Sequence, residues 1–139
     1  MPKSIAIIGA GLAGLTLGQR LAPLAAVTLF EKSRGLGGRM ANRRRSDYAF
    51  DHGAQYFTAR SESFKSMVSE ALVAGSIGTW PDALPTLTVS SERIADPRAG
   101  ENRYVGMPGM TGFANHLARG LDISKEVAVT SLTRQDNLW

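Results

Sequence analysis

The sequence has no cysteine among its 139 residues and only two histidines. The lack of cysteine excludes a disulfide framework, a thiolate metal site and a cysteine nucleophile. Neither histidine has a serine or carboxylate partner at a meaningful catalytic spacing, and His, Asp and Glu do not cluster as metal ligands do. We therefore expect no metal and assign no catalytic residue. We interpret His52 as structural and His116 as exposed.

Long hydrophobic runs are also missing. No run approaches the roughly 20 apolar residues that cross a bilayer, and the apolar run at 5–8 stops at Gly9, too early for the core of a signal peptide. Hydrophobic residues make up 43% of the chain and charged residues 20%, a balance typical of a soluble globular protein. The sequence therefore predicts a cytoplasmic protein without a membrane partner.

Positive charge is in moderate excess. The net charge is +4, the sequence pI is about 9.9, and Arg43–Arg45 is the densest basic cluster. Nucleic-acid-binding segments usually combine such cations with stacking aromatics, and none is interleaved with this arginine run. We therefore expect no nucleic-acid partner and interpret the cluster as a solvated face.

The first 31 residues have the pattern of a strand, a helix and a second strand. Residues 5–8 form a β-branched apolar run, as in a parallel strand buried on both faces. Leucines recur at helical spacing over 12–24, with Pro23 near the expected helix end. The apolar run 27–30 predicts the second strand. Together these features predict a βαβ unit with parallel strands and a right-handed crossover.

Residues 9–14 read Gly-Ala-Gly-Leu-Ala-Gly and match G-x-G-x-x-G between the predicted strand and helix. Gly9 permits a tight turn out of the strand, Gly11 lets a pyrophosphate approach the backbone, and Gly14 lets the helix pack closely on the sheet. The helix amino terminus adds N–H donors and a positive dipole end for phosphates. This segment predicts a dinucleotide site.

Glu31 follows Gly14 by 17 residues (31 minus 14), at the end of the predicted second strand. An acidic side chain at this place can accept the hydroxyl groups of a ribose, and its charge would repel a 2′-phosphate. The site is therefore predicted to favour FAD or NAD over NADP.

A second segment rich in glycine and arginine, residues 33–45, follows directly and is interpreted as an irregular loop that can contain a short helix. An ordinary NAD-binding domain needs nothing special here. In a flavoprotein, Gly38 and Arg39 would suit a second loop folded against the cofactor, with Arg39 donating hydrogen bonds to phosphate oxygens.

With these motifs the sequence resembles the flavin-containing amine oxidases in the broad sense, and more closely the renalase-like FAD oxidoreductases. The resemblance rests on residues 9–14, Glu31, and the blocks SRGLGGRM at 33–40, FDHGAQYFTAR at 50–60 and GMPGM at 106–110. It implies FAD as the cofactor. The residues that it places against FAD, besides the glycines and Glu31, are Ala13, Arg39, Ala54, Gln55, Tyr56 and the backbone of Val129.

The resemblance also implies a reaction. A hydride equivalent would pass from a small reduced substrate to the flavin, and molecular oxygen would accept it to give hydrogen peroxide. The substrate would be a dihydronicotinamide dinucleotide isomer or an amine. Members of this family are typically more than twice as long as this chain, so the chain is expected to be incomplete and inactive by itself.

The predicted fold class is α/β. It is a Rossmann-like FAD-binding parallel sheet, of the amine oxidase or glutathione reductase type, with the start of an inserted substrate domain. We expect residues 1–60 to form the FAD-binding βαβ unit and flavin-contacting loops, 61–105 to begin the substrate domain, and 106–139 to return to the FAD-binding domain. Within these parts we predict helices over 61–74 and 108–121, short strands over 76–105, and a strand over 127–132.

Two other interpretations remain open. An NAD-binding dehydrogenase or reductase would share residues 9–31 but would need neither Gly38-Arg39 nor the segment with Gln55 and Tyr56. A non-catalytic, truncated FAD-binding fragment would keep the fold without turnover.

Overall fold

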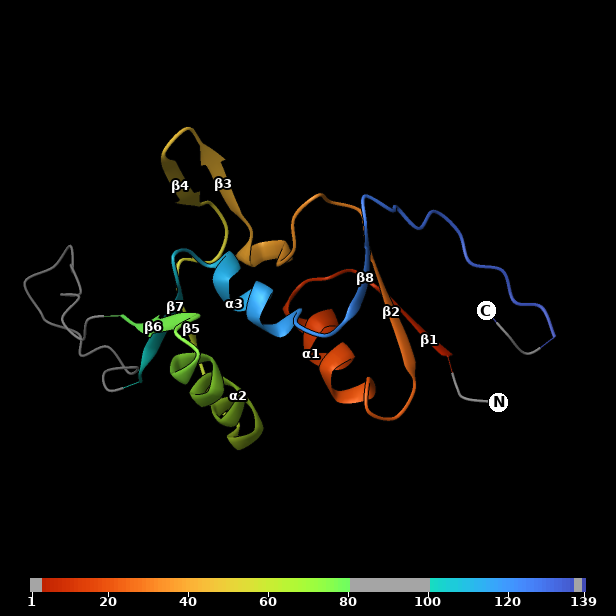
Figure 1. Cartoon of the computed structure of the whole chain (residues 1–139), viewed down its shortest axis with the longest axis horizontal. Coiled ribbons are helices and arrows are strands. Elements are labelled where there is room, and N and C mark those ends of the chain that lie inside the picture. Colours follow the sequence, from red (N-terminus) through yellow and green to blue (C-terminus); the bar gives the residue numbers. More distant parts are fainter. Residues whose placement is uncertain (1–3, 81–100, 137–138) are drawn as a thin grey trace, which may run out of the picture.

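The computed structural model of the protein describes residues 4–80, 101–136 and 139. A three-stranded parallel sheet in it joins two strands from the start of the chain to one from near its end. β1 (Ser4–Ile8) and β2 (Ala26–Glu31) pair in parallel and are joined by α1 (Leu12–Leu21). β8 (Asp122–Lys125) pairs in parallel with the other edge of β2, giving the order β1-β2-β8 (Figure 1). The predicted α/β fold and its first βαβ unit are confirmed.

The core lies between this sheet and the helices. Leu15 of α1 and Leu29 of β2 are fully buried, as are Met110 and Phe113 near the start of α3 (Thr111–Leu117). α1 ends at Leu21, earlier than the predicted Leu24, because Pro23 has no N–H to continue the helical hydrogen bonds. No helix in the described ranges has the length and apolarity needed to cross a membrane.

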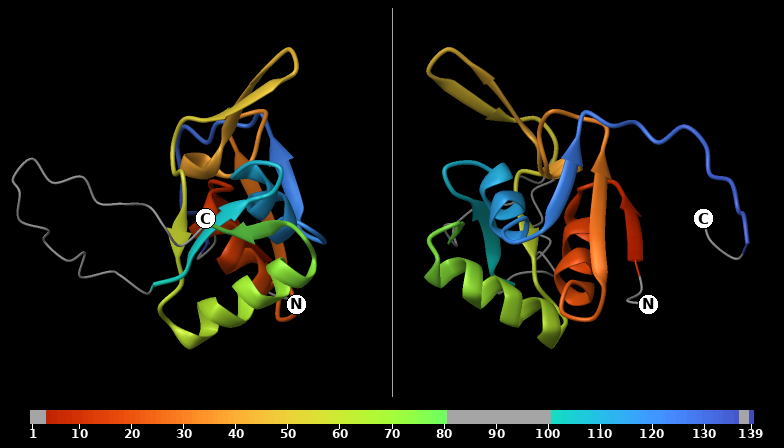
Figure 2. Two further views of the ribbon diagram at one scale, coloured as in Figure 1. Left: turned by 90° about the vertical axis from the view of Figure 1, so that its left-hand side faces the viewer. Right: turned by 45° about the vertical axis from the view of Figure 1, so that its right-hand side comes forward.

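A two-stranded hairpin begins at the end of the segment 33–45 that was predicted to be an irregular loop. After the 3₁₀ turn η1 (Gly38–Met40), β3 (Asn42–Arg45) pairs antiparallel with β4 (Tyr48–Asp51), and the hairpin projects from the body of the protein (Figures 1 and 2). The loop prediction was wrong for these residues because residues 43–50 are all exposed. A strand with two exposed faces does not show the apolar alternation on which such a prediction depends.

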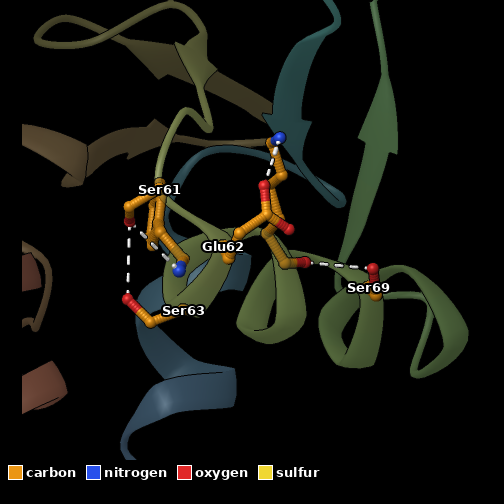
Figure 3. A network of polar contacts seen from close by, with 6 residues as sticks. Ser61, Glu62, Ser63 and Ser69 are labelled. Atoms are coloured by element: carbon orange, nitrogen blue, oxygen red, sulfur yellow. Dashed lines mark hydrogen bonds and ion pairs between the residues drawn. The ribbon is translucent and has the colours of Figure 1, made fainter.

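A second, antiparallel sheet has the order β5-β7-β6, formed by β5 (Phe57–Thr58), β6 (Ile77–Thr79) and β7 (Arg103–Gly106). Between β5 and β6 runs α2 (Glu62–Val73), which confirms the helix predicted over 61–74. The Ser61 hydroxyl caps it by accepting the Phe64 N–H at 3.3 Å (Figure 3), and Gly75 ends it with φ of 65°. Residues 81–100 of the predicted strand-and-loop segment lie outside the described residues.

α3 covers seven residues, fewer than the predicted 108–121. Its start is delayed because residues 106–110 fold against the base of the hairpin, where the Met110 N–H donates to both carboxylate oxygens of Asp51 at 3.1 and 3.2 Å. After α3 the chain turns through Gly120, with φ of 74°, and enters β8.

The strand predicted over 127–132 is not formed. Instead β8, which begins five residues earlier at Asp122, pairs with β2. The register of β8 ends with Lys125 opposite Glu31, the last residue of β2. Glu126 then turns the chain with φ of 61°, and the Val127 N–H makes a last hydrogen bond to the Glu31 carbonyl oxygen at 3.0 Å. Beyond this point β2 offers no further residue for pairing, which leaves Val129 in an exposed, irregular tail.

Candidate dinucleotide-binding site

The first glycine loop has the tight geometry that its sequence predicts. Gly9 has φ of 97° and donates its N–H to the Phe30 carbonyl oxygen at 2.8 Å. A Cβ at Gly14 would overlap the Gly9 carbonyl oxygen, so only glycine lets α1 pack this closely on the loop. In the described part of the chain no side chain caps α1, and its first turn holds no acidic residue. The N–H groups at this helix start therefore suit an anionic ligand.

Glu31 lies next to this loop, as predicted. Its carboxylate accepts the Ala10 N–H at 2.9 Å through one oxygen and the Ser33 N–H at 2.8 Å through the other. The residue is only 7% exposed. A carboxylate has about four acceptor positions, so two bound N–H groups leave capacity for ribose hydroxyls.

The charge of Glu31 is maintained despite burial. Burial raises the pKa of this carboxyl, but the hydrogen bonds from Ala10 and Ser33 and the positive charge of Lys32 together lower the pKa below its ordinary value. Glu31 is therefore ionised near neutral pH, and a negative phosphate placed beside it would be repelled.

The second glycine loop is bonded directly to the first. The Gly37 N–H donates to the Ala10 carbonyl oxygen at 2.9 Å, and Gly37 forms a parallel bridge with Gly11. Gly37 has φ of 106°, a conformation that favours glycine. The loop that sequence reasoning assigned to the cofactor thus lies beside the glycine loop, with Gly38 next to Gly11.

A third segment closes the same site. The Ala54 N–H donates to the Arg39 carbonyl oxygen at 2.8 Å. A Cβ at Gly53 would overlap that same oxygen, so the close approach of the two backbones requires glycine there. This contact fixes the start of the 53–60 segment against the second loop.

These three segments line one open groove with a volume of about 920 Å³, at the upper end of the range usual for ligand pockets. Apolar walls come from Ile8, Phe57 and Met110. The predicted cofactor residues that line the groove are Gly9, Gly11, Ala13, Gly14, Gly38, Arg39 and Ala54.

Four other predicted cofactor residues are not part of the groove lining. Glu31 contacts the first glycine loop through the Ala10 N–H. Gln55 is exposed. The ring of Tyr56 faces Trp80, with 6.3 Å between centroids, and the Arg103 guanidinium lies 5.2 Å from the Tyr56 ring centroid. Val129 lies in the exposed tail. Their contacts with a cofactor stay predictions.

Sequence reasoning missed the role of Asp51 and misjudged His116. Asp51 holds residues 106–110 against the groove through Met110, a contact between positions 59 apart that no local motif signals. His116 is half-buried, not exposed. Burial and the positive charge of Arg119 lower its pKa, which Glu70 partly opposes. His52, interpreted as structural, is exposed.

Comparisons with known proteins found a family model and a solved structure that are similar to part of the chain. Residues 7–71 match the model of a family described as an NAD(P)-binding Rossmann-like domain. Among solved structures, the chain is similar to the CLA-producing fatty acid isomerase from P. acnes, with 24% identity and a TM-score of 0.41, over 50% of this chain and 17% of that chain. The chain thus spans less than a fifth of the length of that enzyme. The parallel sheet has a Rossmann-like α/β fold. The glycine loop and the match over residues 7–71, which is just under half of the chain, support a dinucleotide cofactor.

Proposed function

We propose that this chain binds FAD and serves an oxidoreductase that takes a hydride equivalent from a small reduced substrate, with molecular oxygen as acceptor and hydrogen peroxide as product. The observation that carries the proposal is the bonding of the second glycine loop to the first, through Gly37 and Ala10. A single glycine loop is enough for an NAD site. A second loop that adds Arg39 to the same groove suits a flavin dinucleotide.

The chemistry of the groove fits such a ligand. A Cβ at Gly11 would meet only the Gly37 carbonyl oxygen, at 4.0 Å, so space is open where a pyrophosphate would approach. The N–H groups at the start of α1 and the Arg39 guanidinium supply donors for phosphate. The ionised Glu31 carboxylate supplies an acceptor for ribose and disfavours a 2′-phosphate.

The residues of the chain would act by binding and orientation. When bound, a flavin supplies the hydride chemistry itself. Gly11 and the start of α1 would hold the pyrophosphate, Glu31 the ribose, and Arg39 a phosphate oxygen. Ile8, Phe57 and Met110 would keep water from the apolar part of the groove. By resemblance, the substrate is a dihydronicotinamide dinucleotide isomer or an amine.

A second candidate is an NAD-binding dehydrogenase or reductase. The description of the family that matches residues 7–71 favours it, since that description names NAD(P). The two candidates share the first glycine loop and Glu31, and they differ in whether Arg39 and the second loop contact the ligand.

Replacing Arg39 should therefore distinguish them. Under the FAD proposal Arg39→Ala removes a charge-assisted hydrogen bond to phosphate and should weaken FAD binding about tenfold, measured by quenching of flavin fluorescence. Arg34→Ala is the matched control, because Arg34 lies in the same loop, is exposed and does not line the groove. Equal FAD affinity in both variants would argue against the proposed role of the second loop.

A further inference from the structure

The β3–β4 hairpin is a surface that the proposed dinucleotide site does not use. It stands out from the body of the protein in every view (Figures 1 and 2), and residues 43–50 are exposed along both strands. Among the residues that the structure describes, side-chain hydrogen bonds join the hairpin to the body at its base: the Asn42 N–H donates to the Thr111 hydroxyl at 2.9 Å, and Asp51 accepts the Met110 N–H. The exposed residues 43–50 are accessible to a partner.

The register gives the two faces of this ribbon different chemistry. Arg43 lies opposite Phe50, and Arg45 lies opposite Tyr48. Directly opposed residues share a face, and so do residues two apart along a strand. Arg43, Arg45, Tyr48 and Phe50 therefore form one face, which we call the Arg-aromatic face. Arg44, opposite Ala49, points to the other side.

The aromatic rings of this face are available for contact. Tyr48 is 69% and Phe50 59% exposed, and their ring centroids are 6.3 Å apart with 28° between the ring planes. The cations beside them are also available. In the ranges that the structure describes, the ion pairs join Arg60 to Glu101 and Lys65 to Glu62, and none involves Arg43–Arg45.

We propose that the Arg-aromatic face binds single-stranded nucleic acid. The two guanidinium groups would contact backbone phosphates, and the rings of Tyr48 and Phe50 would stack on unpaired bases. The inference goes beyond the proposed FAD function and does not depend on it. It also removes the reason for expecting no nucleic-acid partner: the arginine run has no aromatics interleaved along the chain, but the hairpin places two directly opposite it.

The shape of the face favours a polymer over a free nucleotide. Small ligands bind mainly in concave pockets, whereas this ribbon is open on both faces. A single strand can gather several weak contacts along such a surface, because each phosphate and each base adds to binding. The net charge of +4 and the sequence pI of about 9.9 also favour an anionic polymer as the partner.

The test is the affinity of the full chain for a short, fluorescently labelled oligothymidine, measured by anisotropy over a range of salt concentrations. Arg43→Ala and Arg45→Ala should each reduce the slope of log affinity against log salt by about 0.7, the value for one phosphate contact on a single strand. Tyr48→Ala and Phe50→Ala should each weaken binding about tenfold and leave the slope unchanged.

Arg44→Ala is the matched control, because it removes the same charge from the same strand but from the opposite face. Under the proposal, Arg44→Ala changes the salt slope and the affinity less than Arg43→Ala and Arg45→Ala do. All five positions are exposed, and circular dichroism checks that each variant stays folded.

Several results would overturn the proposal. The first is absence of oligothymidine binding by the unmodified chain. Equal losses in all three arginine variants would show that only net charge matters. Displacement of the oligonucleotide by ADP would place binding in the glycine-loop groove. Binding to vesicles of anionic phospholipid without binding to the oligonucleotide would assign the face to a membrane surface.

Discussion

Replacing Glu31 with alanine should lower the free energy of unfolding by about 2–4 kcal/mol, since the substitution leaves two N–H groups without their acceptor and each buried, unpaired donor costs about 1–3 kcal/mol. The Ala10 N–H is fully enclosed and should account for most of the loss, whereas Ser33 is exposed and water can partly replace its bond. Urea unfolding followed by circular dichroism measures the change.

Glu31→Gln is the control for this effect, because the amide keeps one acceptor oxygen and nearly the same shape. It should retain one of the two hydrogen bonds and lose about half as much stability as Glu31→Ala. An ordinary surface substitution changes the free energy of unfolding by no more than about 0.5 kcal/mol. If Glu31→Ala changes it by no more than this, the carboxylate does not organise the loop.

The same residue makes stability depend on pH in a defined direction. The pKa of Glu31 in the folded protein lies below its ordinary value of 4.5. Its contribution is therefore fully present above pH 4.5 and is lost as the pH falls through the lower, folded-state pKa. Glu31→Gln cannot titrate, so its stability should fall less steeply below pH 4.5 than that of the unmodified protein. If the two curves of stability against pH run parallel, the Glu31 carboxylate does not contribute through its charge.

Gly14→Ala should destabilise the loop and helix even though alanine is the better helix former. Alanine gains about 1 kcal/mol over glycine inside a helix. Against this, the new Cβ would overlap the Gly9 carbonyl oxygen, which is backbone and cannot move aside without shifting the loop. Such overpacking costs about 1–3 kcal/mol or more, so the net change should be destabilising, and phosphate-binding geometry should be lost with it.

Two glycines provide matched controls for this variant. Gly18→Ala lies in the same helix, but the atoms nearest to its Cβ are side-chain ends of Leu29 and Leu121, at 3.0 to 3.5 Å, and not backbone. Gly35→Ala has nothing within 4 Å of the new Cβ. Thermal unfolding should rank Gly14→Ala as the most damaging of the three. A Gly14→Ala variant that is more stable than the unmodified chain would contradict this, because the loop would then have moved to make room for the new Cβ.

The parts of this site that the sequence predicted correctly are local. The spacing of Gly9, Gly11 and Gly14 after an apolar strand, and of Glu31 at the end of the next strand, determines a βαβ unit with few alternatives. Its loop geometry follows from steric limits on residues within one turn. For this reason Glu31 lies within hydrogen-bond distance of the glycine loop.

The errors concern which distant segments pair. The β-rich run 127–132 has a stronger strand pattern than Asp122–Lys125, yet the latter pairs with β2, because the turn after α3 brings it to that strand first and β2 ends at Glu31. The β3–β4 hairpin was missed because neither of its faces is buried, so its strands lack an apolar alternation. The contact of Asp51 with Met110 joins the base of this hairpin to a segment 59 positions away and has no local signal.

The central claim is that the two glycine loops form one groove for FAD. Calorimetric titration of the purified chain with FAD, NAD⁺ and NADP⁺ tests it most directly. FAD should bind most tightly, because it can contact both loops, and NADP⁺ most weakly, because the Glu31 carboxylate repels its 2′-phosphate. Tighter binding of NAD⁺ or NADP⁺ than of FAD would contradict it.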